Sequence, residues 1–234
     1  MSNKFLLKDL NKNLSKKDIL QNLQILLKKF DNKKIVFSTS FSMEDQIITD
    51  IIFFNNLPIK IFTLDTGRLF EDTYKVLKKT IDFYKKKIFT FFPESQDIEK
   101  LYFEKGAFSF YLSLENRKEC CFLRKVKPIK RALKGVECWI TGIRATQSEA
   151  RKKLDFFMWD ENFNLIKYNP LLNWSLEDVN DYVKNKNLPY NNLYDKGFLS
   201  IGCEPCTRKI KKDEDIRSGR WWWENNTKKE CGLH

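Results

Sequence analysis

Six cysteines and a single histidine are the residues of this 234-residue chain whose types and spacing could do chemistry. Cys120 and Cys121 are adjacent, and Cys203 and Cys206 form a C-x-x-C pair. Four cysteines in two close pairs suit a tetrahedral thiolate site for an iron–sulfur cluster or for zinc. The alternative is that the first pair packs in a core and the second is a simple thiol pair. The polar, basic surroundings ECCFLRK and GCEPCTRK favour the metal site.

The last six residues, KECGLH, hold Cys231 and the only histidine, His234. A thiol near positive charge has a lowered pKa and is more nucleophilic at neutral pH. Cys231 is therefore a candidate nucleophile, which His234 could orient or deprotonate; a stray cysteine on a terminus is the alternative. The preceding RSGRWWWE argues against a stray end, because three successive tryptophans cannot all face one way. They are either core residues or the anchor of a lid.

The elements that must position these residues alternate along the chain. Apolar residues at helical spacing predict helices over 15–30, 43–54, 69–84 and near 95–104. Short β-branched runs predict strands over 34–40, 58–66, 87–93 and 138–142, and Cys138 in the last of these is expected to be a core residue. A basic helix near 118–134 must be kinked or divided by Pro128. This alternation predicts an α/β fold with a mainly parallel sheet and helices on both faces.

From about residue 156 the pattern changes. FFMWDENFNLIKY predicts a hairpin, and residues 174–186 predict a helix capped by Ser175 and Asp178. We expect an α/β nucleotide-binding domain over 1–187 and a loop-rich C-terminal extension over 188–234, acting as one functional domain. No apolar run approaches the roughly 18 residues of a membrane helix, and no secretory signal is visible. We therefore expect a soluble, cytoplasmic protein in which disulfides do not persist.

Three segments that directly follow predicted strands are rich in hydroxyl groups, charges or glycine: SFSMED (40–45), LDTGR (64–68) and TGIRATQSEAR (141–151). In parallel sheets, ligands bind beyond the carboxyl ends of the strands, where helix amino ends favour anions. We expect the three to converge on a nucleotide or phosphate site, although any single loop could be an ordinary capped turn. The net charge of +12 fits a polyanionic partner, or lysines scattered over solvated helix faces, which we favour.

Together these segments resemble the assimilatory sulfonucleotide reductases, and among them the iron–sulfur adenylyl-sulfate (APS) reductases. The resemblance runs from SFSMEDQII through LDTGRLFEDTY, ECCFLRKVKPIKRAL, TGIRATQSEAR, NPLLNWSLEDV and PYNNLYDKGFLSIGCEPCTR to RSGRWWWE and KKECGLH. One departure is Ser42, where members often have glycine. The resemblance implies an adenine nucleotide α-hydrolase-like fold and one 4Fe–4S cluster per chain, held by Cys120, Cys121, Cys203 and Cys206.

The implied reaction is the reduction of APS to sulfite and AMP by reduced thioredoxin or a similar thiol protein, in sulfate assimilation and cysteine biosynthesis. Cys231 would attack the sulfur of APS, and thioredoxin would then cleave the S-sulfocysteine. By position in the matching motifs, the residues expected to contact substrate are Arg144, Arg217 and Arg220 at the phosphosulfate, Lys125 between cluster and substrate, Ser40, Ser42 and Asp65 at the adenosine part, and His234.

Several alternatives stay open. The same chemistry on 3′-phosphoadenylyl sulfate (PAPS) is the nearest, although classical PAPS reductases share ECGLH and lack the two cysteine pairs. An RNA-thiolating or RNA-binding iron–sulfur protein would fit the charge, but SFSMED stands where related thiolation enzymes carry an SGGxDS loop. A zinc-bound interaction module is the third. No membrane association and no nucleic acid partner are expected, and a homo-oligomer is left open.

Overall fold

A computed structural model describes residues 3–13 and 18–224 of the protein, with side chains from residue 6 onwards. Its described residues form two compact units that are interleaved along the chain. We call residues 3–13, 18–63, 75–89 and 133–191 the sheet unit, and residues 64–74, 90–132 and 192–224 the cysteine unit. The functional division expected at residue 187 stays a prediction.

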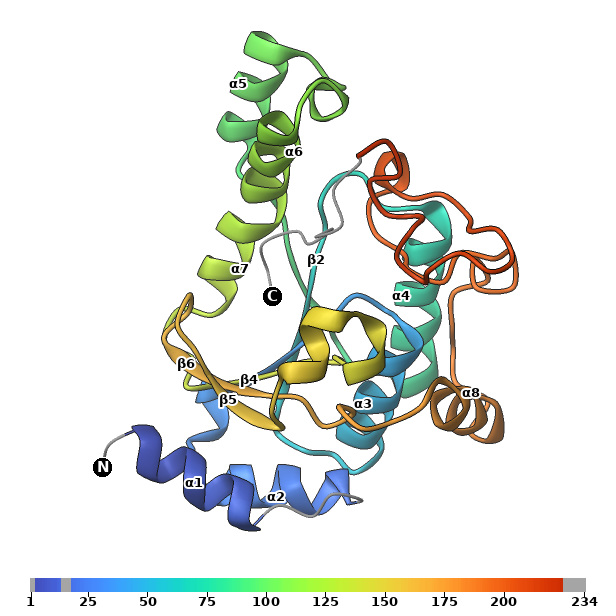
Figure 1. The fold of residues 1–234 in the computed structure, drawn as a ribbon. Helices are drawn as coiled ribbons and strands as arrows, with labels where there is room; N and C mark the ends of the chain where they lie inside the picture. Colours follow the sequence, from blue (N-terminus) through green and yellow to red (C-terminus); the bar gives the residue numbers. More distant parts are fainter. Residues whose placement is uncertain (1–2, 14–17, 225–234) are drawn as a thin grey trace. The chain divides into compact units, whose positions relative to one another are not determined.

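Helices and strands alternate through most of the chain (Figure 1). The strands are β1 (Ile35–Thr39), β2 (Lys60–Leu64), β3 (Phe89–Phe91), β4 (Cys138–Ile140), β5 (Phe157–Asp160) and β6 (Leu165–Tyr168). The helices are α1 (Asn3–Asn13), α2 (Ile19–Lys29), α3 (Met43–Phe54), α4 (Glu71–Tyr84), α5 (Ser95–Lys105), α6 (Leu114–Cys121), α7 (Lys127–Ala132) and α8 (Leu176–Asn185). Among the described residues, no helix is long and apolar enough to cross a membrane.

The six strands form one sheet in the order β3-β2-β1-β4-β6-β5. β1 pairs in parallel with β2 and with β4, and β4 pairs in parallel with β6. β5 runs antiparallel to β6, which confirms the hairpin predicted after residue 156. β4 and β6 are buried along their whole length, as strands covered on both faces must be. The predicted class, a mainly parallel sheet with helices on both faces, is confirmed.

Each unit has its own core. In the sheet unit, Phe37 and Ile140 of the central strands are completely buried and pack with Ile47 and Ile48 of α3. In the cysteine unit, a smaller cluster joins Leu101 of α5 and Phe110 to Trp221 and to the four paired cysteines. Trp221 is buried in this cluster, so the first of the three successive tryptophans is a core residue. The cysteines of interest therefore lie in a core separate from that of the sheet.

The basic helix predicted near 118–134 is divided, as expected. Its two α-helical parts, α6 and α7, are separated by a π-helical stretch, Phe122–Val126. Pro128 has no backbone N–H and would break the hydrogen-bond ladder in the middle of a continuous α-helix. It lies in the first turn of α7, where that N–H would have no partner within the helix. A π-helical turn often marks a functional site. Here it carries Arg124 and Lys125, which lie three and four residues after Cys121.

Candidate active site

In the sheet unit, the loop between β1 and α3 is organised around the buried carboxylate of Asp45. Ser40 donates its backbone N–H and its hydroxyl to Asp45 Oδ2 at 2.6 and 2.7 Å. Ser42 is the N-cap of α3, because its hydroxyl accepts a hydrogen bond from the Asp45 N–H at 3.1 Å. Burial raises the pKa of Asp45 to about 6, although the hydrogen bonds from Ser40 oppose the shift. The two predicted serines thus shape this loop; their contact with substrate stays a prediction.

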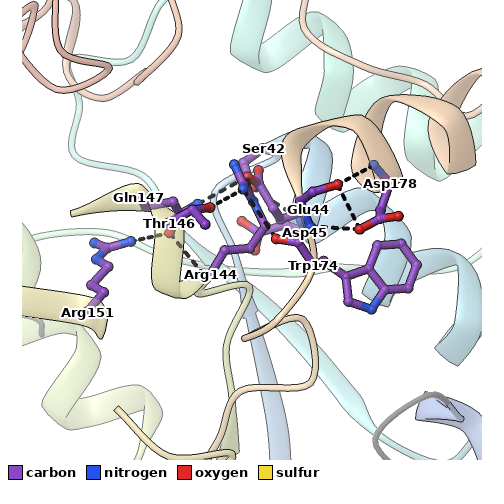
Figure 2. Close-up of polar contacts among 10 residues, drawn as sticks. Ser42, Glu44, Asp45, Arg144, Thr146, Gln147, Arg151, Trp174 and Asp178 are labelled. Atoms are coloured by element: carbon purple, nitrogen blue, oxygen red, sulfur yellow. Dashed lines mark hydrogen bonds and ion pairs between the residues drawn. The ribbon is translucent and has the colours of Figure 1, made fainter. Parts of the chain in front are cut away.

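An ion pair and hydrogen bonds connect the loop after β4 to helix α3 (Figure 2). Arg144 donates from Nε to Glu44 Oε1 at 2.8 Å and from Nη1 to the Thr146 hydroxyl at 2.6 Å. Gln147 donates to the same Glu44 oxygen at 3.0 Å and accepts a hydrogen bond from Arg151. The first and third of the three loops are therefore brought together. Arg144, expected at the phosphosulfate, is buried and ion-paired, and its substrate role stays a prediction.

The second loop, LDTGR, belongs to the cysteine unit. Asp65 is buried and accepts a hydrogen bond from the Gly67 N–H at 2.7 Å, which holds the turn together. The Thr66 hydroxyl lies 3.3 Å from Cys203 Sγ, and Arg124 donates to the Thr66 carbonyl at 2.6 Å. This loop is thus part of the surroundings of the cysteines. The expected role of Asp65 at the adenosine part stays a prediction.

The four paired cysteines line a single pocket of the cysteine unit. Cys120 and Cys121 end α6, Cys203 is the N-cap of a 3₁₀ turn over Glu204–Cys206, and Cys206 is the last residue of that turn. All four are buried, with 7–8 % of each residue exposed. The other lining residues are the basic side chains Arg68, Arg117, Arg124 and Lys125, together with Phe110. The two pairs, 82 residues apart in sequence (203 − 121), therefore meet around one small, cation-lined space.

The charges around the pocket act unequally on the thiols. Although burial opposes ionisation, Lys125, the Thr66 hydroxyl and Arg220 together lower the pKa of Cys203. Burial and the neighbouring Cys203 instead raise the pKa of Cys206 to about 12. Burial also raises the pKa of Cys120. One thiolate is thus favoured by this environment, and binding of iron or another thiophilic metal would have to ionise the others.

Four buried nitrogen atoms in this region have no hydrogen-bond partner among the described residues: Arg68 Nη1, Arg124 Nε, Arg220 Nε and Trp221 Nε1. Two of these side chains line the pocket, Trp221 packs in the cysteine cluster, and the Arg220 guanidinium lies 4.8 Å from the Trp221 ring. Buried donors without acceptors are costly, so a bound group that accepts hydrogen bonds would be stabilising in this region. Thiolates and inorganic sulfide of an iron–sulfur cluster fit that requirement.

The donor set of the pocket suits more than one metal centre. Within the described part of the chain, no group of three or more His, Cys, Asp or Glu side chains is already arranged to hold one ion. Four thiolates are ligands of tetrahedral zinc as well as of an iron–sulfur cluster. The choice between zinc and a cluster is therefore a proposal.

The cationic residues that are expected to contact substrate differ in their burial and in their neighbours. Lys125 lines the pocket and acts electrostatically on both Cys203 and Cys206. Arg220 is buried, donates to the Ile201 carbonyl at 3.2 Å and also acts on these two thiols. Arg217 is half-buried, and its backbone N–H donates to Asp215. The nucleophile candidate Cys231 and His234 lie outside the described residues.

Sequence reasoning missed Arg68, Arg117 and Arg124 as pocket residues. For Arg117 and Arg124, their spacing from the cysteine pair in the sequence indicates a place in the pocket. Arg117 precedes Cys120 and Cys121 by three and four residues, and Arg124 follows them by four and three. Residues three or four apart share one helix face, so both arginines fall beside the cysteine pair. Arg68 has no such signal, because it reaches the pocket only through tertiary folding.

Comparison with known proteins assigns this arrangement to a family. The model of the family described as "Phosphoadenosine phosphosulfate reductase domain" matches residues 34–209, so the chain belongs to this family. The adenosine 5′-phosphosulfate reductase of Neisseria meningitidis serogroup B is 48 % identical over 199 residues, covering 85 % of this chain and 81 % of that protein. The enzyme of the same name from Agrobacterium fabrum is 46 % identical over 201 residues, covering 86 % and 77 %.

Solved structures agree with the family. A phosphoadenylyl-sulfate reductase from Candida auris, crystallised with phosphate, superimposes with a TM-score of 0.72 at 29 % identity, covering 90 % of this chain and 98 % of that one. An FMN adenylyltransferase from Candida glabrata matches with a TM-score of 0.54 at 17 % identity, over 94 % and 79 %. The second likeness concerns the fold alone. It agrees with the expected adenine nucleotide α-hydrolase-like architecture.

Proposed function

We propose that the protein reduces adenylyl sulfate to sulfite and AMP in sulfate assimilation, with a reduced thiol protein of the thioredoxin type as electron donor. The observation that carries the proposal is the cation-lined pocket of four cysteines in a chain of this family. Two curated relatives that match most of the chain, at 48 % and 46 % identity, are named for this substrate. The two thiols of the donor protein supply both electrons.

A 4Fe–4S cluster, one per chain, would be held by Cys120, Cys121, Cys203 and Cys206. The cluster would supply structural and electrostatic support, because the thiols carry the redox change. Three observations support it: four converging thiols, four lining cations and buried nitrogen donors that lack acceptors. Four thiolates bring the negative charge that these cations need.

The chemistry needs a nucleophile and a cationic surface. We assign the nucleophile to Cys231: its thiolate forms an S–S bond with the sulfur of APS, the S–O bond to the phosphate breaks, and AMP leaves with the electron pair. A donor thiolate then attacks Cys231 Sγ, which releases sulfite and leaves a mixed disulfide between Cys231 and the donor. The second donor thiolate attacks the donor sulfur of that mixed disulfide, which forms the disulfide of the donor and frees the Cys231 thiolate. Fixed cations stabilise the transferring anion best in a site shielded from water. We assign that role to Lys125 and Arg220, and their electrostatic influence on the thiols of Cys203 and Cys206 supports the assignment.

The direct test is sulfite release by anaerobically purified protein with reduced thioredoxin, given APS or PAPS in parallel. Cys231→Ser should abolish sulfite release. The matched control is Cys138→Ser, because Cys138 is completely buried in β4 and takes no part in the mechanism. Iron and acid-labile sulfide per chain, measured on the same samples, report the cluster.

Each outcome separates the candidates. A far higher rate with APS than with PAPS supports the proposed substrate, and the reverse assigns the protein to PAPS. Sulfite release by protein that contains stoichiometric zinc and no iron would contradict the proposed cluster and support the proposed reaction. No sulfite from either substrate, with the iron retained, would contradict the reductase function and favour a role in RNA modification.

A further inference from the structure

Arg68 lines the pocket of the four paired cysteines, which we call the cysteine pocket, and its guanidinium group is held by neighbours in the same unit. Its Nη2 donates to the Tyr102 hydroxyl at 2.7 Å and to the Ala107 carbonyl. The guanidinium carbon lies 4.8 Å from the centre of the Phe110 ring and 5.5 Å from that of Tyr102, which is within the range of a cation–π contact. Because the guanidinium group is planar, these contacts fix its orientation as well as its position.

The other terminal nitrogen of this guanidinium group, Nη1, is buried and has no hydrogen-bond partner among the described residues. Burying a charged donor without giving it an acceptor is unfavourable. The charge of Arg68 also reaches the thiols: burial raises the pKa of Cys120, and the charges of Arg124 and Arg68 oppose that rise. Nη1 is therefore the part of Arg68 that is available to a negatively charged group in the cysteine pocket.

The backbone of Arg68 is joined to the C-x-x-C segment. The Arg68 carbonyl accepts a hydrogen bond from the Glu204 N–H at 2.8 Å, and the Arg68 N–H donates to the Thr66 hydroxyl at 3.3 Å. The next residue, Leu69, pairs with Cys203 in an antiparallel bridge. Arg68 is thus fixed at both ends, at the backbone beside the second cysteine pair and at the guanidinium group by Nη2.

Tyr102 of α5 is shared by two arginines that line the cysteine pocket. Its hydroxyl oxygen lies 2.7 Å from Arg68 Nη2 and 3.4 Å from Arg124 Nη2. Arg124 is held further by the Thr66 carbonyl, which accepts from Nη1 at 2.6 Å, and its Nε is buried without a hydrogen-bond partner among the described residues. Each of the two arginines therefore has some nitrogens bound to the protein and one buried nitrogen left without an acceptor.

We propose that Arg68 is a cofactor-binding residue of the cysteine pocket, whose Nη1 donates to a sulfur atom of the bound cluster, and that Tyr102 is the residue that positions it. The inference rests on the proposed function only through the cluster, because no contact of Arg68 with APS is required. Net charge and hydrogen bonds to sulfur set the reduction potential of an iron–sulfur cluster. Arg68 therefore raises that potential and slows the loss of iron.

Three variants test this assignment. Arg68→Gln removes the charge, whereas Arg68→Lys keeps it but replaces the planar fork that holds Tyr102 and Ala107 by a single ammonium group. Tyr102→Phe removes only the shared acceptor. The matched control is Arg208→Gln, because Arg208 forms a bidentate pair with Glu214 at 2.9 and 3.0 Å in the same unit and is absent from the pocket lining.

Two properties of each anaerobically purified protein are measured without substrate: the midpoint reduction potential of the cluster, and the rate at which an excess of a ferrous chelator removes its iron. We expect a more negative potential in Arg68→Gln and an iron loss at least about tenfold faster, because a charge-assisted hydrogen bond is removed. Arg68→Lys should lie between Arg68→Gln and the wild type. Tyr102→Phe should change both properties in the same direction, with iron loss about threefold faster. Arg208→Gln should behave as the wild type.

Two results would overturn the role of Arg68. One is an unchanged potential in Arg68→Gln. The other is faster iron loss with an unchanged potential in every Arg68 variant, because Arg68 would then only support the fold around the pocket. The role of Tyr102 is tested by the double variant: Tyr102→Phe should have a smaller effect where Arg68 is already glutamine, and fully additive effects would contradict positioning through Arg68.

Sulfite release from APS, assayed on the same samples, keeps this inference separate from the proposed function. A wild type that holds iron and releases no sulfite would contradict the reductase function, while the potentials and iron-loss rates would still decide the role of Arg68. A wild type that holds no iron would overturn the cluster and this inference together.

Discussion

Replacing the buried carboxylate of Asp45 by an amide should stabilise the protein at neutral pH and not at acid pH. Burial raises the pKa of Asp45 in the folded protein to about 6, from 3.8 when unfolded. A carboxyl group whose folded pKa is raised favours the folded state while it is protonated, below pH ~4. That contribution is lost as the pH rises towards 6. The free energy of unfolding of the wild type should therefore decrease between pH ~4 and pH 6, because the contribution of the protonated Asp45 carboxyl is lost.

The magnitude follows from the shift. About 2.2 pKa units correspond to about 3 kcal/mol, at about 1.4 kcal/mol per unit. In Asp45→Asn this component is absent, and the amide oxygen can still accept from Ser40. Asparagine has nearly the same shape, which matters because the Gly142 backbone lies directly against this side chain. The difference in free energy of unfolding, variant minus wild type, should therefore rise by about 3 kcal/mol between pH 4 and pH 7.5.

The assay is urea unfolding followed by far-UV circular dichroism at several pH values, accepted where both proteins give the same m-value. Any packing defect introduced by asparagine is independent of pH, so only the change of the difference with pH tests the reasoning. Asp178→Asn is the control of opposite sign: backbone and side-chain hydrogen bonds from Ser175 lower the pKa of Asp178. Its removal should cost stability at neutral pH and progressively less in acid. A difference for Asp45→Asn that is flat with pH would refute the reasoning.

Three further substitutions test close contacts. In Gly142→Ala, the new Cβ would lie 2.1 Å from the buried Asp45 carboxylate, so we expect a loss of about 1–3 kcal/mol in thermal or urea unfolding. In Gly202→Ala, the new Cβ would lie 2.3–2.6 Å from the Arg220 guanidinium and must displace it; APS affinity should fall while iron per chain stays constant. In Tyr182→Phe, Asp50 loses the hydroxyl donor at 2.9 Å, and unfolding should become easier by about 1–2 kcal/mol, with the APS affinity unchanged.

Local patterns in the sequence were sufficient for most of the fold. The apolar pattern over 43–54 predicts helix α3 over its observed range, and the structure adds Ser42 as its N-cap. The capping box of α8, with Ser175 and Asp178, was likewise visible in four residues. Buried strands such as β4 were found because they are short, β-branched or aromatic, and bounded by polar turns. Each of these features depends on residues close together in the chain.

The contacts that organise the site depend on residues far apart, and the sequence did not reveal them. Arg144 was expected at the substrate from its motif, yet its Nε is paired with Glu44, 100 residues earlier. LDTGR was grouped with the two other strand-end loops, yet the Thr66 hydroxyl contacts Cys203, 137 residues later. Ion pairs and hydrogen bonds of this separation leave no periodic signal, because either partner alone looks like an ordinary surface residue or cap.

The charge balance of the cysteine pocket connects its fold to its proposed cofactor. Four cations line the pocket, Arg68, Arg117, Arg124 and Lys125, and the guanidinium of Arg117 forms an ion pair with Glu224. Thiols bring negative charge to this pocket only as thiolates. Burial raises the pKa of Cys120, whereas burial together with the neighbouring Cys203 raises the pKa of Cys206 to about 12. Metal binding would ionise these thiols and bring negative charge beside the lining cations, so the same cations would favour the metal-bound pocket.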